Sequence, residues 1–183
     1  LHQLAALFTT AAANARCSHA VWVTGEGFQR VANDTQPPSA WGELPLGGAR
    51  SFEEAHGLLP PRLRRQGIRI VISDLFWPGD PLPTLRKLTE GAAAVTLVQL
   101  LAPSDLEPPK PGNVQLEDSE TGETLSLYID TTIQEQYRKT LQRLQQSWDH
   151  AAQQTGAELV TLIADNLQGS LRSLEECRTL EPA

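Results

Sequence analysis

Two near-continuous apolar runs, at residues 68–72 and 95–101, constrain the fold of this chain more than any other feature. A third run of this kind lies at residues 159–163, and segments with a helical spacing of apolar residues separate the three. Strands that are apolar at successive positions, instead of at alternate ones, are typical of parallel sheets that helices cover on both faces. The sequence therefore predicts an α/β fold with a mostly parallel sheet, in which residues 68–72 form a buried strand.

Helices are predicted where apolar residues recur every three or four positions. The predicted segments are residues 4–15, 52–59, 82–88, 133–151 and 167–174. Ser51 and Glu54 have the spacing of a capping box at the start of the second segment. That helix would bury one face, which consists of Phe52, Ala55, Leu58 and Leu59. Thr132 and Glu135 repeat the capping-box spacing before the fourth segment, and Gly156 would end it.

Two β-hairpins are predicted from shorter patterns. Residues 20–24 and 28–31 are short apolar segments on either side of a Gly-Glu-Gly turn. Residues 116–129 have apolar residues at alternate positions near their end and a turn-forming acidic segment at residues 118–123. We expect this second hairpin, within residues 113–130, to be an insertion in a single domain that spans residues 1–183, because this length corresponds to about one domain.

Composition excludes several classes of protein. The chain has 15 Lys and Arg against 22 Asp and Glu, a net charge of −7, which argues against non-specific binding to nucleic acid or to an anionic membrane surface. No run approaches the roughly 20 apolar residues of a membrane span. The two cysteines, Cys17 and Cys177, lie at opposite ends of the chain, so we expect free thiols in a reducing, cytoplasmic compartment.

Sequence motifs of the common enzyme classes are absent, and the remaining candidate residues follow the predicted strands. The chain has no phosphate-binding loop and no nucleophile elbow, and its four histidines are scattered. Open α/β sheets bind ligands at the carboxyl ends of their strands. The polar residues predicted at this rim are Thr24, Glu26, Ser73, Asp74, Ser104, Asp105 and Asp165, with Ser51 at the start of a helix that could return to it.

This rim has two interpretations. Hydroxyl and carboxylate oxygens brought together at one edge could hold a hard cation such as Mg²⁺. Asp and Ser that follow strands also commonly close turns and cap the next helix, which requires no ligand. The spacing of the residues leaves both interpretations open.

The order of several segments resembles the family called domain of unknown function 58, whose C-terminal half is a von Willebrand factor A-like domain. The matching segments are residues 71–75, 98–106, 116–123, 137–138 and 156–157, so the resemblance covers about residues 48–174. It implies a Rossmann-like, von Willebrand factor A-type sheet. In such domains an Asp-x-Ser-x-Ser motif on the first strand binds a divalent ion together with a later Thr and Asp. Asp74 matches that Asp, and Ser51 lies near the place of the Thr.

The Asp-x-Ser-x-Ser motif and its strand do not occur in this sequence. The chain begins at Leu1 and contains no methionine. Either the first, central strand lies upstream of this chain, or the metal site of this member is degenerate. Without a central strand we expect unpaired edges, and hence a rearranged sheet or pairing with another chain.

Three functions are compatible with these observations. The resemblance implies a non-enzymatic interaction or adaptor module that works with a MoxR-type AAA+ ATPase or with another von Willebrand factor A-like protein. Its docking would be either assisted by Mg²⁺ or metal-free. The alternative is a metal-dependent hydrolase at the same rim, with Asp74 and Asp165 as metal ligands and Glu26 as base. A third possibility is a structural domain whose second hairpin offers an edge for β-addition.

Overall fold

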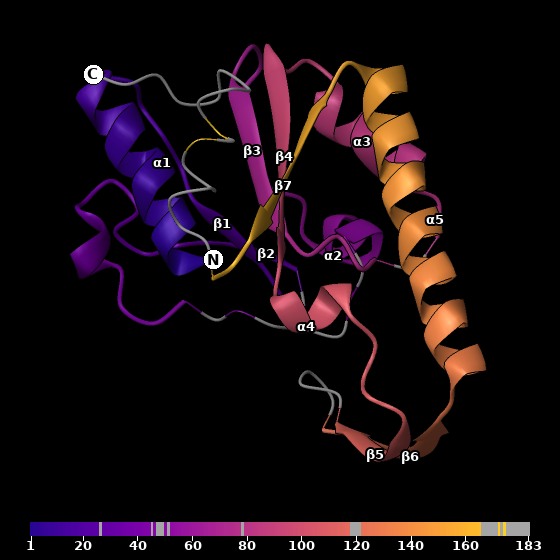
Figure 1. The fold of residues 1–183 in the computed structure, drawn as a ribbon. Coiled ribbons are helices and arrows are strands. Elements are labelled where there is room, and N and C mark those ends of the chain that lie inside the picture. The colour runs from indigo at the N-terminus through magenta and orange to yellow at the C-terminus, as the bar shows by residue number, and fades with distance from the viewer. Residues whose placement is uncertain are drawn as a thin grey trace. The chain divides into compact units, whose positions relative to one another are not determined.

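The computed structural model describes residues 1–25, 27–44, 46, 50, 52–77, 79–117, 122–165, 172 and 174 (Figure 1). The chain divides into two compact units, Leu1–Arg65 and Gln66–Ala183. The single domain expected over residues 1–183 stays a prediction. Among the described residues, no helix is both long enough and apolar enough to cross a membrane.

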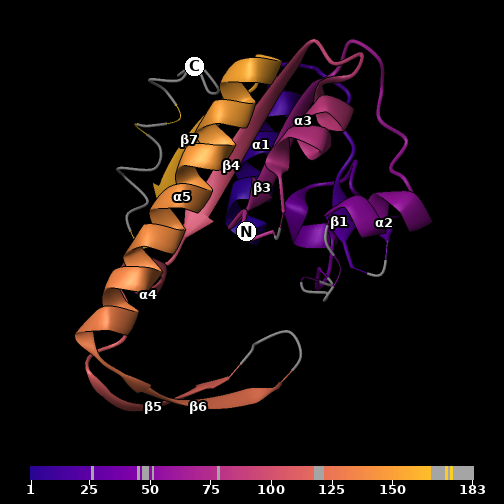
Figure 2. The ribbon, with the colours of Figure 1, turned by 90° about the vertical axis from the view of Figure 1, so that its right-hand side faces the viewer.

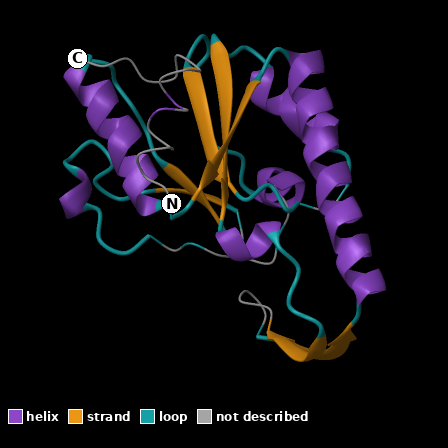
Figure 3. Ribbon diagram, viewed as in Figure 1, coloured by secondary structure: helices purple, strands orange, loops and turns teal. Residues whose placement is uncertain are grey.

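The first unit consists of short elements (Figure 3). They are helix α1 (His2–Asn14), strands β1 (Trp22–Thr24) and β2 (Phe28–Arg30), the 3₁₀ helix η1 (Pro38–Ala40) and helix α2 (Phe52–Leu58). Strands β1 and β2 pair antiparallel, which confirms the first predicted hairpin. Buried Val23, Val31 and Trp41 form a core against which Ala5, Val21 and Leu44 pack.

Helix α2 buries less of its surface than predicted. Phe52 and Ala55 are buried, but Leu58 and Leu59 are 60% and 55% exposed, so the prediction was wrong for these two leucines. Phe52 packs edge-on against Phe28 at 5.2 Å between ring centroids, and the Leu59 carbonyl accepts a hydrogen bond from Phe28 N–H at 3.1 Å. The chain leaving α2 is thus held by its backbone, and the leucine side chains remain outside. Ser51, the predicted cap, lies outside the described residues.

The second unit contains a three-stranded parallel sheet, as the apolar runs predicted. Its strands are β3 (Ile68–Ser73), β4 (Ala94–Leu101) and β7 (Glu158–Ile163), in the order β3-β4-β7. Helices α3 (Pro81–Thr89) and α5 (Thr131–Thr155) lie side by side on one face of it, and the short helix α4 (Pro103–Leu106) follows β4 (Figures 1 and 2). The mixed α/β fold with helices flanking a parallel sheet is confirmed, whereas the prediction that helices cover both faces of the sheet stays a prediction.

Strand β4 is the buried strand of this sheet, and the prediction for residues 68–72 was wrong. Val95, Leu97, Val98 and Leu101 are at most 3% exposed, whereas Ile68 is 73% exposed and no residue of β3 is fully buried. The reason is the strand order, because β4 has a neighbour on each side, while β3 pairs with β4 alone among the described strands. The two apolar runs have similar compositions, so the sequence does not show which strand is central in the sheet and which lies at its edge.

Helix α5 has 25 residues, and its two ends are set by local chemistry. Asp130 is the N-cap, and its carboxylate accepts a hydrogen bond from Ile133 N–H at 2.8 Å. The predicted capping box of Thr132 and Glu135 is therefore wrong, since an aspartate two residues earlier already caps the helix. Gly156 ends the helix at φ +71°, in the left-handed region that favours glycine, as predicted.

The second hairpin consists of β5 (Gly112–Glu117) and β6 (Thr124–Ile129), which pair antiparallel with each other. This confirms the predicted hairpin, although its first strand begins at Gly112 and its tip lies outside the described residues. The two views place the hairpin beyond one end of α5, away from the parallel sheet (Figures 1 and 2). The predicted last helix, residues 167–174, lies outside the described residues except for Arg172 and Leu174.

Candidate functional site

The carboxyl edge of the parallel sheet carries Ser73, the last residue of β3, and three of the predicted acidic site residues. Asp74 follows β3, Asp105 lies in α4 after β4, and Asp165 follows β7. Asp74 and Asp165 are exposed, and Asp105 is half-buried. Thr24 ends β1 in the first unit, where it is exposed. Glu26 and Ser51 lie outside the described residues.

The loop after β3 is folded back on itself by its own side chains. The Ser73 hydroxyl accepts a hydrogen bond from Leu75 N–H at 3.1 Å, and Asp74 Oδ1 accepts one from Phe76 N–H at 3.0 Å. Leu75 has φ +60° and is completely buried. A leucine in the left-handed region is uncommon, and burial of its side chain supplies a reason for it. Ser73 and Asp74 therefore both shape this turn.

Two buried side chains from other elements hold the same loop. Trp148 Nε1–H of α5 donates to the Leu75 carbonyl at 2.9 Å, and Gln99 Nε2–H of β4 donates to the Asp74 carbonyl at 3.0 Å. Gln99 is fixed in turn by the Thr161 hydroxyl, which donates to its Oε1 at 3.0 Å. Trp148 and Gln99 are 2% and 1% exposed. Sequence analysis missed both residues, although a glutamine inside a buried apolar run is a visible signal that something polar needs a partner.

The result is a loop that is held by hydrogen bonds and presents two side chains to solvent. Asp74 is exposed, and Phe76 is 40% exposed. The ring of Trp77, next in sequence, meets the Trp148 ring edge-on at 5.3 Å between centroids. We call residues 74–76 the rim loop.

Asp105 has a structural task. Its Oδ2 accepts a hydrogen bond from Ala102 N–H at 2.8 Å, at the start of α4. Its carbonyl accepts a hydrogen bond from the Tyr137 hydroxyl of α5 at 2.9 Å. Burial raises the pKa of the Tyr137 phenol, and the negative charge of Asp105 raises it further. Asp105 thus joins α4 to α5, as the turn-and-cap interpretation of the rim expects.

The magnesium site predicted at the rim includes ligands that lie only in part among the described residues. Mg²⁺ prefers six oxygen ligands in octahedral geometry, usually including one or two carboxylates. Within the described ranges, no three His, Cys, Asp or Glu side chains are grouped as a metal ion would require. Asp74 supplies one carboxylate, and its Oδ1 already closes the turn. Magnesium binding by Asp74 and Ser51 stays a prediction.

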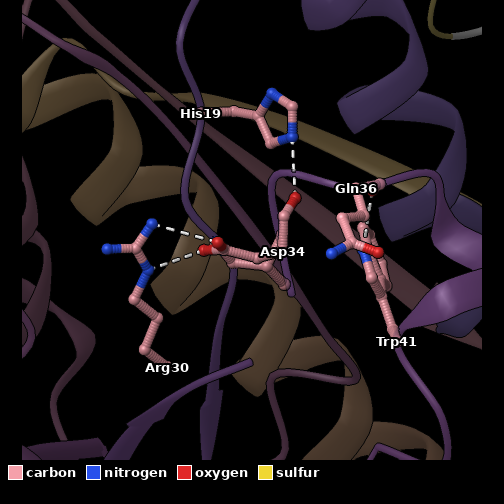
Figure 4. A network of polar contacts seen from close by, with 6 residues as sticks. His19, Arg30, Asp34, Gln36 and Trp41 are labelled. Atoms are coloured by element: carbon pink, nitrogen blue, oxygen red, sulfur yellow. Dashed lines mark hydrogen bonds and ion pairs between the residues drawn. The ribbon is translucent and has the colours of Figure 1, made fainter. Parts of the chain in front are cut away.

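A second polar network, in the first unit, surrounds the buried carboxylate of Asp34 (Figure 4). Its oxygens accept hydrogen bonds from Val21 N–H at 2.9 Å and from Arg30 Nε and Nη2 at 2.8 and 3.0 Å. His19 Nε2 lies 2.9 Å from the Asp34 carbonyl. Burial alone would raise the pKa of Asp34, but these hydrogen bonds and the positive charge of Arg30 hold it below its ordinary value. The network ties β1, β2 and the following loop together, and sequence analysis did not find it.

Comparison with known proteins identifies the family. The chain matches the family described as "Protein of unknown function DUF58" over residues 28–147, more than half of its length. The chain belongs to the DUF58 family. This confirms the resemblance seen in the sequence segments.

The curated relatives that this DUF58 chain matches are described as uncharacterized proteins. A protein of Mycobacterium avium is 30% identical over 105 residues, which cover 56% of this chain and 60% of the relative. Proteins of Mycobacterium bovis and Mycobacterium tuberculosis are 28% identical over 102 residues, which cover 56% of this chain and 32% of each relative. The DUF58 chain thus spans less than two thirds of the length of these relatives.

A solved structure is also similar to this DUF58 chain. It is the crystal structure of the conserved hypothetical protein BatB from Bacteroides thetaiotaomicron, with 16% identity and a TM-score of 0.45. The match covers 97% of this chain and 85% of that one.

Proposed function

We propose that this DUF58 chain is a non-catalytic interaction module that docks a partner protein through its rim loop. The observation that carries the proposal is the fixation of this loop. Its backbone is held by buried Trp148 and Gln99, while Asp74 and Phe76 remain exposed. Binding residues are commonly found on loops that a rigid scaffold positions.

The fixed backbone favours docking for an energetic reason. A partner that binds a flexible loop must order its backbone, at a cost of about 1–2 kcal/mol for each residue. In the rim loop, hydrogen bonds to the Leu75 and Asp74 carbonyls and to the Phe76 N–H already restrict the backbone. Much of that ordering cost is therefore met before binding.

The exposed side chains define the partner's chemistry. Phe76 would enter an apolar pocket, and the neighbouring Asp74 would pair with a Lys or Arg at its rim. The family resemblance suggests that this partner is a MoxR-type AAA+ ATPase or another von Willebrand factor A-like protein, met in the cytoplasm. It also suggests a von Willebrand factor A-type fold. The docking that we propose uses the side chains of Asp74 and Phe76 directly and requires no metal ion.

The test is a binding measurement with the purified chain and the MoxR-type ATPase encoded in the same genome. Phe76→Ala and Asp74→Asn should each weaken binding about ten-fold or more, as expected for central interface residues. Asparagine keeps an oxygen that can accept the Phe76 N–H, so this variant removes charge and retains the turn. Leu58→Ala, which truncates an exposed apolar side chain outside the rim loop, is the matched control for Phe76→Ala and should bind like the wild type.

Two results would contradict the proposal. Wild-type affinity in the Phe76→Ala variant would show that the rim loop is not the docking surface. Binding that EDTA abolishes and Mg²⁺ restores would show that docking depends on a metal ion. Binding unaffected by EDTA is the expected result.

A further inference from the structure

The segment that follows helix α2, residues 59–65, combines apolar and basic side chains at the surface. Its sequence is Leu-Pro-Pro-Arg-Leu-Arg-Arg, and we call it the arginine segment. Leu59 and Leu63 are 55% and 36% exposed, and the three arginines are exposed as well. Three of the six basic residues of the unit Leu1–Arg65 therefore lie within four consecutive positions, next to two leucines that the chain does not bury.

The backbone of the arginine segment is held at several points. The Leu59 carbonyl accepts a hydrogen bond from Phe28 N–H at 3.1 Å, and Leu63 N–H donates to the Pro61 carbonyl at 3.0 Å. Gly27 lies so close to Leu59 that a Cβ added there would come within 2.9 Å of the Leu59 Cβ. Proline fixes φ at about −65°, so the two prolines restrict the chain between the two leucines. Much of the backbone order that binding requires is therefore present before a partner arrives.

Two of the three arginines are available to a partner. Arg64 Nη1 donates a hydrogen bond to the Ser18 hydroxyl. Among the described residues, neither Arg62 nor Arg65 has a side-chain hydrogen bond or an ion pair. An unpaired guanidinium keeps five N–H donors, in a planar geometry that matches a carboxylate. The arginine segment is therefore complementary to a surface that has Asp or Glu beside apolar side chains.

The charge of the remaining chain selects among anionic partners. Apart from the three arginines, 12 of the 15 basic residues remain, against 22 acidic ones. A membrane surface or a nucleic acid is an extended anion, and it would repel this excess of negative charge. A protein site presents its carboxylates locally, and charges more than about 8 Å away from them are largely screened at physiological salt. The charge distribution therefore favours an acidic site on a protein.

We infer that the arginine segment docks an acidic amphipathic surface of a partner protein, in which apolar side chains are flanked by Asp or Glu. Leu59 and Leu63 pack on the apolar side chains, and Arg62 and Arg65 bind the carboxylates. The arginine segment shares no residue with the rim loop, so the inference goes beyond the proposed function and does not depend on it.

The test uses the full chain and a labelled synthetic peptide of Leu and Glu, with its leucines on one helical face, and measures binding by fluorescence anisotropy. Arg62→Gln/Arg65→Gln should weaken binding about ten-fold and reduce its dependence on salt. Arg138→Gln/Lys139→Gln is the matched control, because it removes the same charge at exposed residues of helix α5. This control should bind within about two-fold of the wild type.

A second pair of variants tests the apolar contribution. Leu59→Ala/Leu63→Ala should weaken binding about ten-fold. Leu116→Ala/Leu125→Ala is the matched control, since it truncates two leucines of the β5–β6 hairpin that are 40% and 57% exposed, and it should bind within about two-fold of the wild type. Thermal unfolding of each variant is measured alongside. The arginine variant changes only exposed side chains, so it keeps the test valid if the leucine variant is destabilised.

Four results would overturn the inference. Equal weakening by the two charge variants would show only non-specific attraction between opposite charges. Equal weakening by the two leucine variants would show that the leucines of the arginine segment are not contacted. Equal binding of a peptide with the same composition in scrambled order would show that the amphipathic pattern is not recognised. Binding to phosphatidylglycerol vesicles or duplex DNA instead of the peptide, lost in Arg62→Gln/Arg65→Gln, would assign the segment to a membrane or a nucleic acid.

Discussion

Replacing Trp148 with phenylalanine would break the hydrogen bond that joins helix α5 to the rim loop. The indole Nε1–H donates to the Leu75 carbonyl at 2.9 Å, and Trp148 and Leu75 are 2% and 0% exposed. Phenylalanine keeps an aromatic ring but has no donor, so the Leu75 carbonyl would stay buried without this partner. An unsatisfied buried acceptor costs about 1–3 kcal/mol. The smaller ring adds a packing loss on the order of 1 kcal/mol.

We therefore expect Trp148→Phe to lower the free energy of unfolding by about 2–4 kcal/mol. For a chain of this length, that corresponds to a fall of about 5–15 °C in Tm. Urea unfolding followed by far-ultraviolet circular dichroism is a suitable assay, because the 25-residue helix α5 contributes strongly to that signal. If the rim loop docks a partner, the same variant should also weaken binding, because its loop is less well held.

Gln99→Leu is the matched comparison for this prediction. It removes the hydrogen bonds to the Asp74 carbonyl and from the Thr161 hydroxyl. Asp74 and Thr161 are exposed residues, so water can replace the lost partner, and leucine fills a similar volume. The expected cost is below about 1 kcal/mol. A Trp148→Phe variant within about 0.5 kcal/mol of the wild type would refute the reasoning, as would Gln99→Leu being the more costly change.

Two further predictions concern single residues with defined tasks. Because the pKa of Asp34 is lowered in the folded chain, its contribution to stability is complete above the ordinary aspartate pKa of about 4 and is lost as the pH falls through the lowered value. Asp34→Asn should remove this part of the acid sensitivity. Urea midpoints measured across a pH series test this, and an unchanged dependence of stability on acid pH would show that Asp34 does not cause it. Gly156→Ala should cost about 1 kcal/mol, because φ is +71° there and nothing lies within 4 Å of the added methyl group, so that backbone strain is the main term. Thermal unfolding measures this cost, and a stabilised Gly156→Ala variant would be incompatible with it.

The helices and strands of the fold could be predicted from the sequence more completely than their burial and their neighbours. Periodicity found the long helix α5, the two hairpins and the three parallel strands, because each pattern is local. Strand order is not local, and for that reason β3 was predicted to be buried and lies at the edge of the described sheet. The cap of α5 was missed because Asp130 and Thr132 are both good capping residues, and only backbone geometry chooses between them.

The candidate site shows the same division between local and long-range information. Asp74 and Asp105 were placed at the correct edge, because the carboxyl ends of parallel strands meet there. Their fixation was not predictable, because it depends on Trp148 and Gln99, which lie far away in the sequence and act through hydrogen bonds to backbone carbonyls. Sequence patterns carry little information about such contacts.

Asp74 could serve the turn and a partner at once, and two variants separate these tasks. A carboxylate accepts several hydrogen bonds, so the bond from Phe76 N–H to Oδ1 leaves capacity for a partner's Lys or Arg. Asparagine keeps the turn acceptor without the charge, whereas alanine loses both. If docking uses the charge, Asp74→Asn weakens binding by itself. Asp74→Ala weakens it at least as much, and only alanine also loosens the turn and lowers Tm by a few degrees, equivalent to about 1 kcal/mol. If Asp74 only shapes the loop, asparagine binds like the wild type and alanine alone binds weakly, which would remove Asp74 from the docking surface and leave Phe76 as its anchor.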